Sequence, residues 1–206
     1  SNPDPFLRQG SVSTLRSTWR SQSDFIADVL NFALWPGHYP NQSGLATWTE
    51  ELIDGEDFAA AAHDLAFLDM TTMVGLPSFR LTLAAVASAE GDEIIKDAIA
   101  ESWRRTQEPF KQLYAAVLTA RGLKLREGIT MDEFADMLTA LASGLRIKAV
   151  AAPHARVIDH DRQRSLLGKA GLALVLGCIE KTRDSTGTTV EEAANLLAGG
   201  RKGLPS

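Results

Sequence analysis

Two histidines and two aspartates that lie close together in the chain could in principle bind a divalent metal ion. The four residues are His154, Asp159, His160 and Asp161. Nitrogen and oxygen donors of this kind are typical metal ligands. A solvated loop before a capped helix explains the same residues more simply, because Asp159 or Asp161 would then be a helix-start acid stabilised by the helix dipole. We therefore expect neither a metal site nor a cofactor.

The signatures of the common catalytic sites are missing from the sequence. The chain has four histidines, but it contains no Gly-x-Ser-x-Gly turn, no glycine-rich phosphate loop and no His-Glu-x-x-His helix. The single cysteine, Cys178, lies in an apolar run, where burial suppresses the thiolate and favours a small core residue. One cysteine cannot form an internal disulfide, which favours a reducing, cytoplasmic setting. The sequence thus predicts a protein that is not an enzyme.

Length and charge limit the possible partners. The 206 residues suffice for one large domain or two small ones, and the net charge of −5 argues against a protein that coats nucleic acid over its whole surface. Positive charge is present near the N-terminus, at Arg8, Arg16 and Arg20, whereas the stretch 37–75 has acidic residues but no lysine or arginine. Any DNA contact is therefore expected at the N-terminus. The longest apolar run, residues 170–179, has about half of the ~20 residues that a membrane span needs, so we expect no membrane partner.

Apolar residues recur with helical spacing along almost the whole chain. The stripe over residues 132–150 follows a capping box at Thr130 and Glu133, in which each side chain satisfies an amide of the first turn. A similar pattern predicts a helix over about 21–34, and Pro109 is expected to kink or divide another helix. Further helices are predicted over about 43–53, 56–74, 78–89, 92–121, 161–183 and 189–198. Because no segment shows the sustained alternation of strands, we predict an all-α fold.

The predicted helix over 161–183 is apolar on all sides in its middle, so more than one neighbour must cover it. Its small residues, which would let another backbone approach closely, are Gly168, Gly171, Ala173 and Gly177. One reading is a central core helix of a monomer. The other is a homodimer interface shared with the helix over 131–149, in which two copies form a four-helix bundle. The candidate interface residues are Phe134, Leu138, Leu141, Leu167, Ala170, Gly171, Leu174, Gly177 and Cys178.

Two stretches of the chain resemble a known family. Residues 11–25 read Ser-Val-Ser-Thr-Leu-Arg-Ser-Thr-Trp-Arg-Ser-Gln-Ser-Asp-Phe. This segment resembles the end of the helix-turn-helix in TetR-type transcriptional regulators, where a Ser-x-x-Thr-Leu-x-x-x-aromatic recognition helix precedes a Ser-x-x-Asp/Glu start of the long connecting helix. The stretch over 122–153 also resembles the carboxyl-terminal half of that family, where a helix of this kind joins the dimer.

The resemblance implies a partial helix-turn-helix DNA-binding domain over 1–22 and a ligand-binding and dimerisation domain over 23–206. The candidate DNA-binding residues are Ser13, Thr14, Arg16, Ser17, Thr18 and Arg20. Their hydroxyls and guanidinium groups suit phosphates and base edges. Leu15 and Trp19, four residues apart, are expected to pack inward and to hold the recognition helix on its neighbours.

The segment departs from the family pattern in two ways. The family usually has an aromatic residue, a histidine and a lysine where this chain has Arg16, Thr18 and Gln22. It also has two helices before the recognition helix, which residues 1–10 of this chain are too few to form. We therefore expect that the front of the DNA-binding head is missing from the chain.

The resemblance further implies a small-molecule pocket within the helical body. The candidate ligand-binding residues are His63, Phe67, Met70, Trp103, Gln107, Phe110 and Tyr114. An apolar wall with a few polar groups is typical of such sites, and plain core packing is the alternative for each residue. The expected function is that of a regulator that binds double-stranded operator DNA as a homodimer and is released or retuned by a small, apolar or aromatic effector. The alternative is a stand-alone helical ligand-binding or interaction protein that has lost DNA binding.

Overall fold

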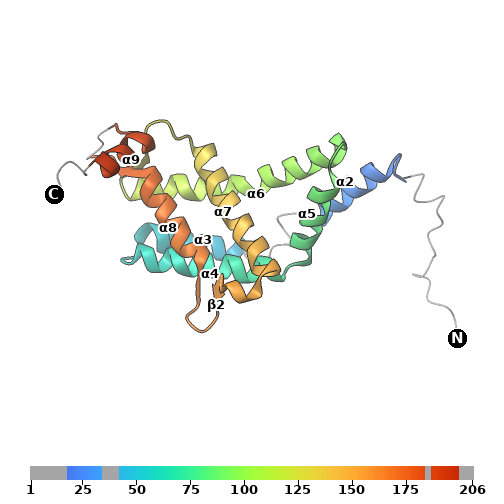
Figure 1. The fold of residues 1–206 in the computed structure, drawn as a ribbon, viewed down its shortest axis with the longest axis horizontal. Helices are drawn as coiled ribbons and strands as arrows, with labels where there is room; N and C mark the ends of the chain where they lie inside the picture. The colour runs from blue at the N-terminus through green and yellow to red at the C-terminus, as the bar shows by residue number, and fades with distance from the viewer. Residues whose placement is uncertain (1–17, 34–41, 184–186, 200–206) are drawn as a thin grey trace, which may run out of the picture. The chain divides into compact units, whose positions relative to one another are not determined.

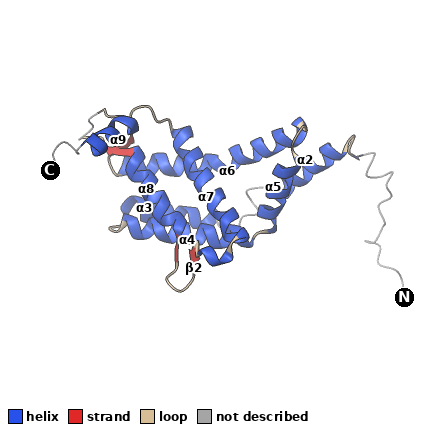
Figure 2. Ribbon diagram, in the orientation of Figure 1, coloured by secondary structure: helices blue, strands red, loops and turns tan. Residues whose placement is uncertain are grey.

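The computed structural model describes residues 18–33, 42–183 and 187–199, and these residues are mainly helical (Figure 1, Figure 2). The helices are α2 (Gln22–Ala33), α3 (Gln42–Asp54), α4 (Phe58–Gly75), α5 (Pro77–Ser88), α6 (Glu93–Ala120), α7 (Met131–Ala151), α8 (Leu166–Cys178) and α9 (Val190–Gly199), with a short 3-10 helix at Pro153–Ala155. Short strands β1 (Leu123–Leu125), β2 (Ile158–Asp159), β3 (Arg164–Ser165) and β4 (Ile179–Lys181) form two antiparallel ribbons within the described ranges. The predicted all-α fold class is confirmed.

Reciprocal side-chain caps begin three of the described helices. At the start of α7 the Thr130 hydroxyl accepts the Glu133 amide at 3.2 Å, and the Glu133 carboxylate accepts the Thr130 amide at 2.8 Å. The same arrangement precedes α9, at Thr189 and Glu192, and α2, at Ser21 and Asp24. Each pair satisfies two amides that the first turn leaves without an intrahelical partner, which is why the sequence places these starts correctly.

Helix α6 runs through a proline. Pro109 was expected to kink or divide the helix, but residues Glu93–Ala120 form one element, so a division is wrong. Pro109 is exposed, so water can satisfy the carbonyl that loses its amide partner. The helix therefore continues across the missing hydrogen bond.

Helix α8 is shorter at both ends than the helix predicted over 161–183, so both predicted ends are wrong. Its front end is replaced by a ribbon of β2 and β3, in which Gln163 has a positive φ of 51° that a helix does not permit. Asp159 belongs to β2, and its carboxylate accepts the Arg162 amide at 3.0 Å across the turn of the ribbon. Neither Asp159 nor Asp161 is thus a helix-start acid. The strands are too short for alternation to be visible in the sequence.

The far end of α8 continues into a ribbon between β1 and β4. Lys124 pairs with Glu180 in register, and their charged groups lie 3.2 Å apart. The Arg126 amide donates to the Cys178 carbonyl at 2.8 Å, and Arg126 Nε donates to the Gly177 carbonyl at 2.9 Å. Burial raises the pKa of the Cys178 thiol, while the charge of Arg126 acts in the opposite direction. Cys178 is thus a buried thiol, as predicted.

The chain forms two compact units. Unit 1 comprises residues 1–39 and 77–105, and unit 2 comprises residues 40–76 and 106–206. The core of unit 1 is made of small and aliphatic side chains from α2, α5 and the first part of α6. They are Leu30, Ala85, Ala89, Ile95, Ala98 and Ile99. Helix α2 belongs to this core because its apolar stripe faces α5 and α6.

Unit 2 has a larger interior built on α3, α4, α7, α8 and the second part of α6. One buried cluster contains Leu52, Ala61, Leu113 and Val117. Another contains Met70, Ala142, Val157 and Leu167. Phe134 is only 2% exposed and meets Tyr114 edge-on, with ring centroids 5.5 Å apart. Unit 2 thus combines its aliphatic clusters with a buried contact between two aromatic rings.

Candidate functional site

The part of the DNA-binding segment that the structure describes is fastened to α2. Trp19 Nε1 donates to the Asp28 carboxylate at 2.7 Å, and the indole meets Phe25 edge-on, with centroids 4.9 Å apart. These contacts leave Trp19 half-buried. Thr18 and Arg20 have exposed side chains. The remaining candidates, Ser13, Thr14, Arg16 and Ser17, and the companion Leu15, lie outside the described residues.

Within unit 1, α2 is held against α6 near both of its ends. The Ser23 hydroxyl donates to the Asp92 carboxylate, which also caps α6 by accepting the Ile95 amide at 3.2 Å. Towards the other end, Arg105 Nη2 donates to the Asn31 side-chain oxygen at 2.7 Å. The hydrogen bond from Ser23, followed by the backbone amides and Lys96, lowers the pKa of Asp92 below its ordinary value. The segment that carries Trp19 is thereby connected to α6.

Three of the predicted ligand-binding residues lie on α4 and pack within unit 2. Met70 is completely buried in the core, and Phe67 meets His160 edge-on at 6.0 Å. His63 lies against the start of α8, so closely that a Cβ on Gly168 would come within 2.3 Å of His63 Nδ1. Gly168 is therefore required for this contact. The structure places all three in side-chain packing.

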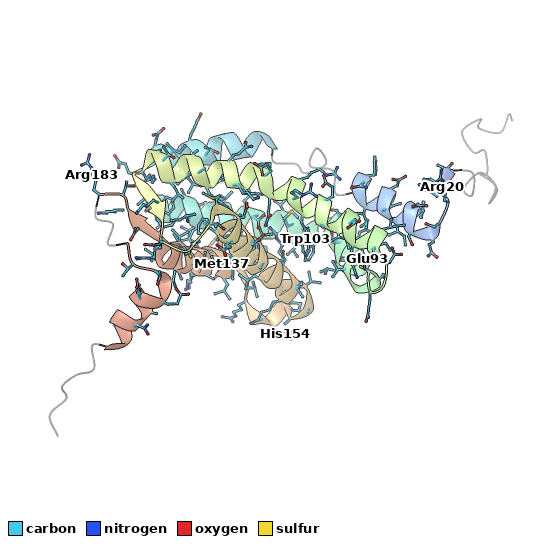
Figure 3. All side chains as sticks on the ribbon, turned by 90° about the horizontal axis from the view of Figure 1, so that it is seen from above. Arg20, Glu93, Trp103, Met137, His154 and Arg183 are labelled. Carbon is cyan, nitrogen blue, oxygen red and sulfur yellow. The ribbon has the colours of Figure 1, made fainter. Side chains whose placement is uncertain are left out.

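Two further candidates on α6 do not join the others. Trp103 is 53% exposed and lies on the part of α6 that belongs to unit 1 (Figure 3). Gln107 donates to Asp136 at 2.6 Å and to Thr139 at 3.4 Å, so its amide already binds α7. Neither residue belongs to the cluster that Phe110 and Tyr114 pack against.

The remaining candidates, Phe110 and Tyr114, pack against the buried cluster around Leu113, and Tyr114 feels the charges of an ion pair that was not predicted. Arg146 of α7 donates through Nη2 to both carboxylate oxygens of Asp69 of α4, at 2.7 and 2.6 Å. The ring centroids of Phe110 and Tyr114 lie 6.4 Å apart. Desolvation, and next the charge of Asp69, raise the pKa of the Tyr114 hydroxyl well above its usual range, and Arg146 acts in the opposite direction. A charged residue at the inward position of an apolar helix is the signal that could have revealed the pair.

The predicted dimer residues divide into two groups. Phe134, Leu167 and Cys178 are buried within the chain, so their side chains do not lie on its surface. Leu138, Leu141, Ala170, Gly171 and Leu174 are half-buried between helices, and Gly177 is exposed. The large apolar side chains that do reach the surface of α7 and α8 were not predicted. They are Ile147, Val150, Leu166 and Leu176, of which Leu176 is 76% exposed.

The proposed metal ligands do not gather. Among residues 18–33, 42–183 and 187–199, no three histidine, cysteine or acidic side chains are placed to hold a metal ion. His154 lies in the 3-10 helix after α7 (Figure 3), whereas His160 contacts Phe67.

No single helix in the described ranges is long and apolar enough to cross a membrane, although α4 and α5 taken together reach that length and composition.

Comparisons with known proteins identify no relative of the chain. No protein-family model, no curated protein and no solved structure matches it. The functional interpretation therefore depends on the residues and their geometry.

Proposed function

We propose that the chain is a TetR-like transcriptional regulator that binds double-stranded operator DNA as a homodimer and responds to a small effector in the cytoplasm. The observation that carries the proposal is the anchoring of Trp19 on α2 by Asp28 and Phe25. In the pattern that residues 11–25 resemble, this aromatic residue ends the recognition helix. A tryptophan held this way is fastened to the helix that follows the resembling segment.

The homodimer is supported by the outer faces of α7 and α8, which lie side by side in unit 2 (Figure 1). Both helices expose large apolar side chains next to small residues. The small exposed residues are Ala140, Gly144, Ala173 and Gly177. Apolar side chains of one copy can fill the spaces above the small residues of the other, which is the self-complementary arrangement that a two-fold dimer needs. We name this surface the α7–α8 face.

Light scattering of the purified chain tests the dimer. The expected mass is that of two chains, and Leu176→Glu is expected to give a monomer because it buries a carboxylate in the contact. Ile94→Glu is the matched control, since Ile94 is also exposed but lies on α6. A wild-type monomer at micromolar concentration, or equal effects of both variants, would contradict the α7–α8 face.

DNA binding is tested with the protein expressed from its complete gene. Duplexes selected from a random pool are expected to bind in a salt-dependent manner, and Arg16→Ala and Arg20→Ala are each expected to weaken binding and reduce the salt dependence. Arg80→Ala is the control, because Arg80 is exposed on α5 of the same unit. A dimer that selects no duplex would favour a stand-alone helical ligand-binding or interaction protein.

A further inference from the structure

Two buried polar atoms lack hydrogen-bond partners where α4 meets β3 and the start of α8. Within the described part of the chain they are Nδ1 of His63, on α4, and the hydroxyl oxygen of Ser165, the residue before α8. Ser165 is only 4% exposed, and its hydroxyl does not cap the helix. The first-turn amides of α8 are therefore not satisfied by the side chain that usually satisfies them.

The ring of His63 lies directly against this first turn. A Cβ on Gly168, the third residue of α8, would come within 2.3 Å of Nδ1 and 3.1 Å of Cε1 of the ring. The next residue of α4, Asp64, accepts a hydrogen bond from Arg164 of β3 across the same contact. The ring is thus held where only a glycine leaves room for it.

The two protonation states of the imidazole suit this place differently. A neutral ring can offer the Nδ1 lone pair to the amides of the first turn, whereas a protonated ring has a hydrogen on both nitrogens. The amino end of a helix also carries a partial positive charge, which disfavours a second positive charge beside it. Asp64 is already bound to Arg164. Uptake of a proton by His63 therefore opposes the contact.

Charged groups on the other elements around α4 are engaged elsewhere or exposed. Asp69 binds Arg146 of α7, and Asp159 of β2 accepts a backbone amide of its own ribbon. Lys111 of α6 lies 2.6 Å from Asp132 of α7. The exposed groups on α3, α6, α7, α8 and the turn between β2 and β3 are Glu50, Glu51, Asp54, Glu108, Glu133, Asp136, Lys148, His160, Asp161 and Lys169.

We infer that the contact of His63 with the start of α8 is an acid-sensitive switch, closed when the imidazole is neutral and weakened when it is protonated. Histidine ordinarily takes up its proton between about pH 8 and pH 5, so the switch responds to mild acid. Protonation weakens the hold of α4 on the β2–β3 ribbon and on α8. The inference goes beyond the proposed function and is independent of it, because it concerns contacts within one chain.

Hydrogen exchange followed by nuclear magnetic resonance tests the switch. Protection factors, which are corrected for the direct effect of pH on exchange, are compared at about pH 7.5 and about pH 5.5. Amides over residues 170–174 are expected to lose up to about tenfold in protection at the lower pH, which is the most that one histidine can contribute over this interval. Amides of α2, in unit 1, serve as the reference and are expected to change less.

A conservative variant tests the titrating group. His63→Asn keeps a side-chain oxygen that can accept an amide, but it does not titrate. This variant is expected to abolish most of the difference between the two pH values. His160→Asn is the matched control, because His160 is exposed and contacts Phe67 of α4. It is expected to keep the difference seen in the wild type.

A second variant tests the close approach of the ring. Gly168→Ala is expected to displace the ring, and so to lower the protection of α8 at both pH values, although alanine ordinarily favours a helix. Gly171→Ala is the control, since its Cβ would meet Leu138 at 4.0 Å, an ordinary contact. If Gly168→Ala does not fold, the comparison of the wild type with His63→Asn still decides.

Three outcomes would overturn the inference. They are an equal effect of pH in the wild type and in His63→Asn, undiminished protection of α8 in the wild type at the lower pH, and a pH effect that His160→Asn removes instead. None of these results bears on DNA binding or on the homodimer, which have tests of their own.

Discussion

Units 1 and 2 differ in how their polar side chains are used. In unit 1 the polar contacts join helices to each other, with Ser23 bound to Asp92 and Asn31 bound to Arg105 at 2.7 Å. In unit 2 Arg146 of α7 donates to both carboxylate oxygens of Asp69 of α4. Each of the two contacts in unit 1 thus pairs a charged group with a neutral one, whereas the contact in unit 2 pairs two opposite charges.

The cores of the two units also differ in the side chains that fill them. Aliphatic side chains surround Leu30 in the core of unit 1, whereas in unit 2 the rings of Phe110, Tyr114 and Phe134 contact one another beside the aliphatic clusters. Aromatic side chains bury a large area each. The comparison teaches that the stability of unit 2 depends more strongly on single aromatic side chains.

The largest effect is expected from Phe134→Ala in unit 2. Phe134 is 2% exposed and contacts Tyr114, so the cavity left by the ring should lower the free energy of unfolding by about 3–5 kcal/mol. Urea denaturation measures the loss. Val86→Ala, at an exposed position of unit 1, is expected to cost less than about 0.5 kcal/mol. Similar losses for both variants would contradict the assigned core.

A smaller loss is expected when the charged pair is broken. Arg146→Met leaves the Asp69 carboxylate without its partner, and since both side chains are partly exposed, at 14% and 23%, the expected loss is about 2 kcal/mol. The double variant Asp69→Leu with Arg146→Met should recover most of this loss, because no charge then remains unpaired. Urea denaturation of the three proteins tests this. An unrecovered double variant would show that the pair itself stabilises the fold.

The hydrogen bond to Asp92 predicts an acid-dependent stability in unit 1. Because the pKa of Asp92 is lowered in the folded protein, its contribution is present above the unfolded value of 3.8 and is lost as the pH falls through the folded pKa. Ser23→Ala removes the largest cause, so its unfolding free energy should fall less steeply below pH 3.8 than that of the wild type. Parallel curves for the two proteins would exclude this contribution.

The smallest effect is spectroscopic and concerns Tyr114. The chain has two tyrosines, and burial raises the pKa of Tyr114 above its ordinary value of 10.0. Absorbance during alkaline titration should therefore contain a late step that is absent from Tyr114→Phe. The unfolded chain loses this proton first, so stability should decrease as the pH rises above about 10. A wild type whose tyrosines both titrate near pH 10 would contradict the desolvation of Tyr114.

The sequence was sufficient for features that depend on neighbours along the chain. Capping boxes such as Thr130 with Glu133 and the apolar stripe that follows are local patterns, and both are confirmed. The predicted ends of α8 were wrong for two reasons. β3 belongs to a ribbon with the neighbouring β2 that is too short to show alternation, and β4 exists only through hydrogen bonds to β1, which is distant in the chain. Distance along the chain also explains why the pair of Arg146 and Asp69 was not predicted, because the two residues lie 77 positions apart.

The candidate ligand-binding residues are only partly brought together by the fold. Phe110 and Tyr114 pack together in unit 2, but Trp103 is exposed although it shares their helix. Helical spacing identifies one face of α6, yet it does not indicate where that face is covered by unit 1, by unit 2 or by water. That information lies in tertiary packing, which no local pattern contains.

The ribbon of β1 and β4 has a consequence for local opening. It joins the chain just before α7 to the chain just after α8, so α7, the β2–β3 ribbon and α8 lie within one closed loop. A loop fastened at its base tends to open as a whole, because partial opening exposes backbone without releasing the ends. Hydrogen exchange of α7 and α8 should therefore report one cooperative segment, whose amides become labelled together.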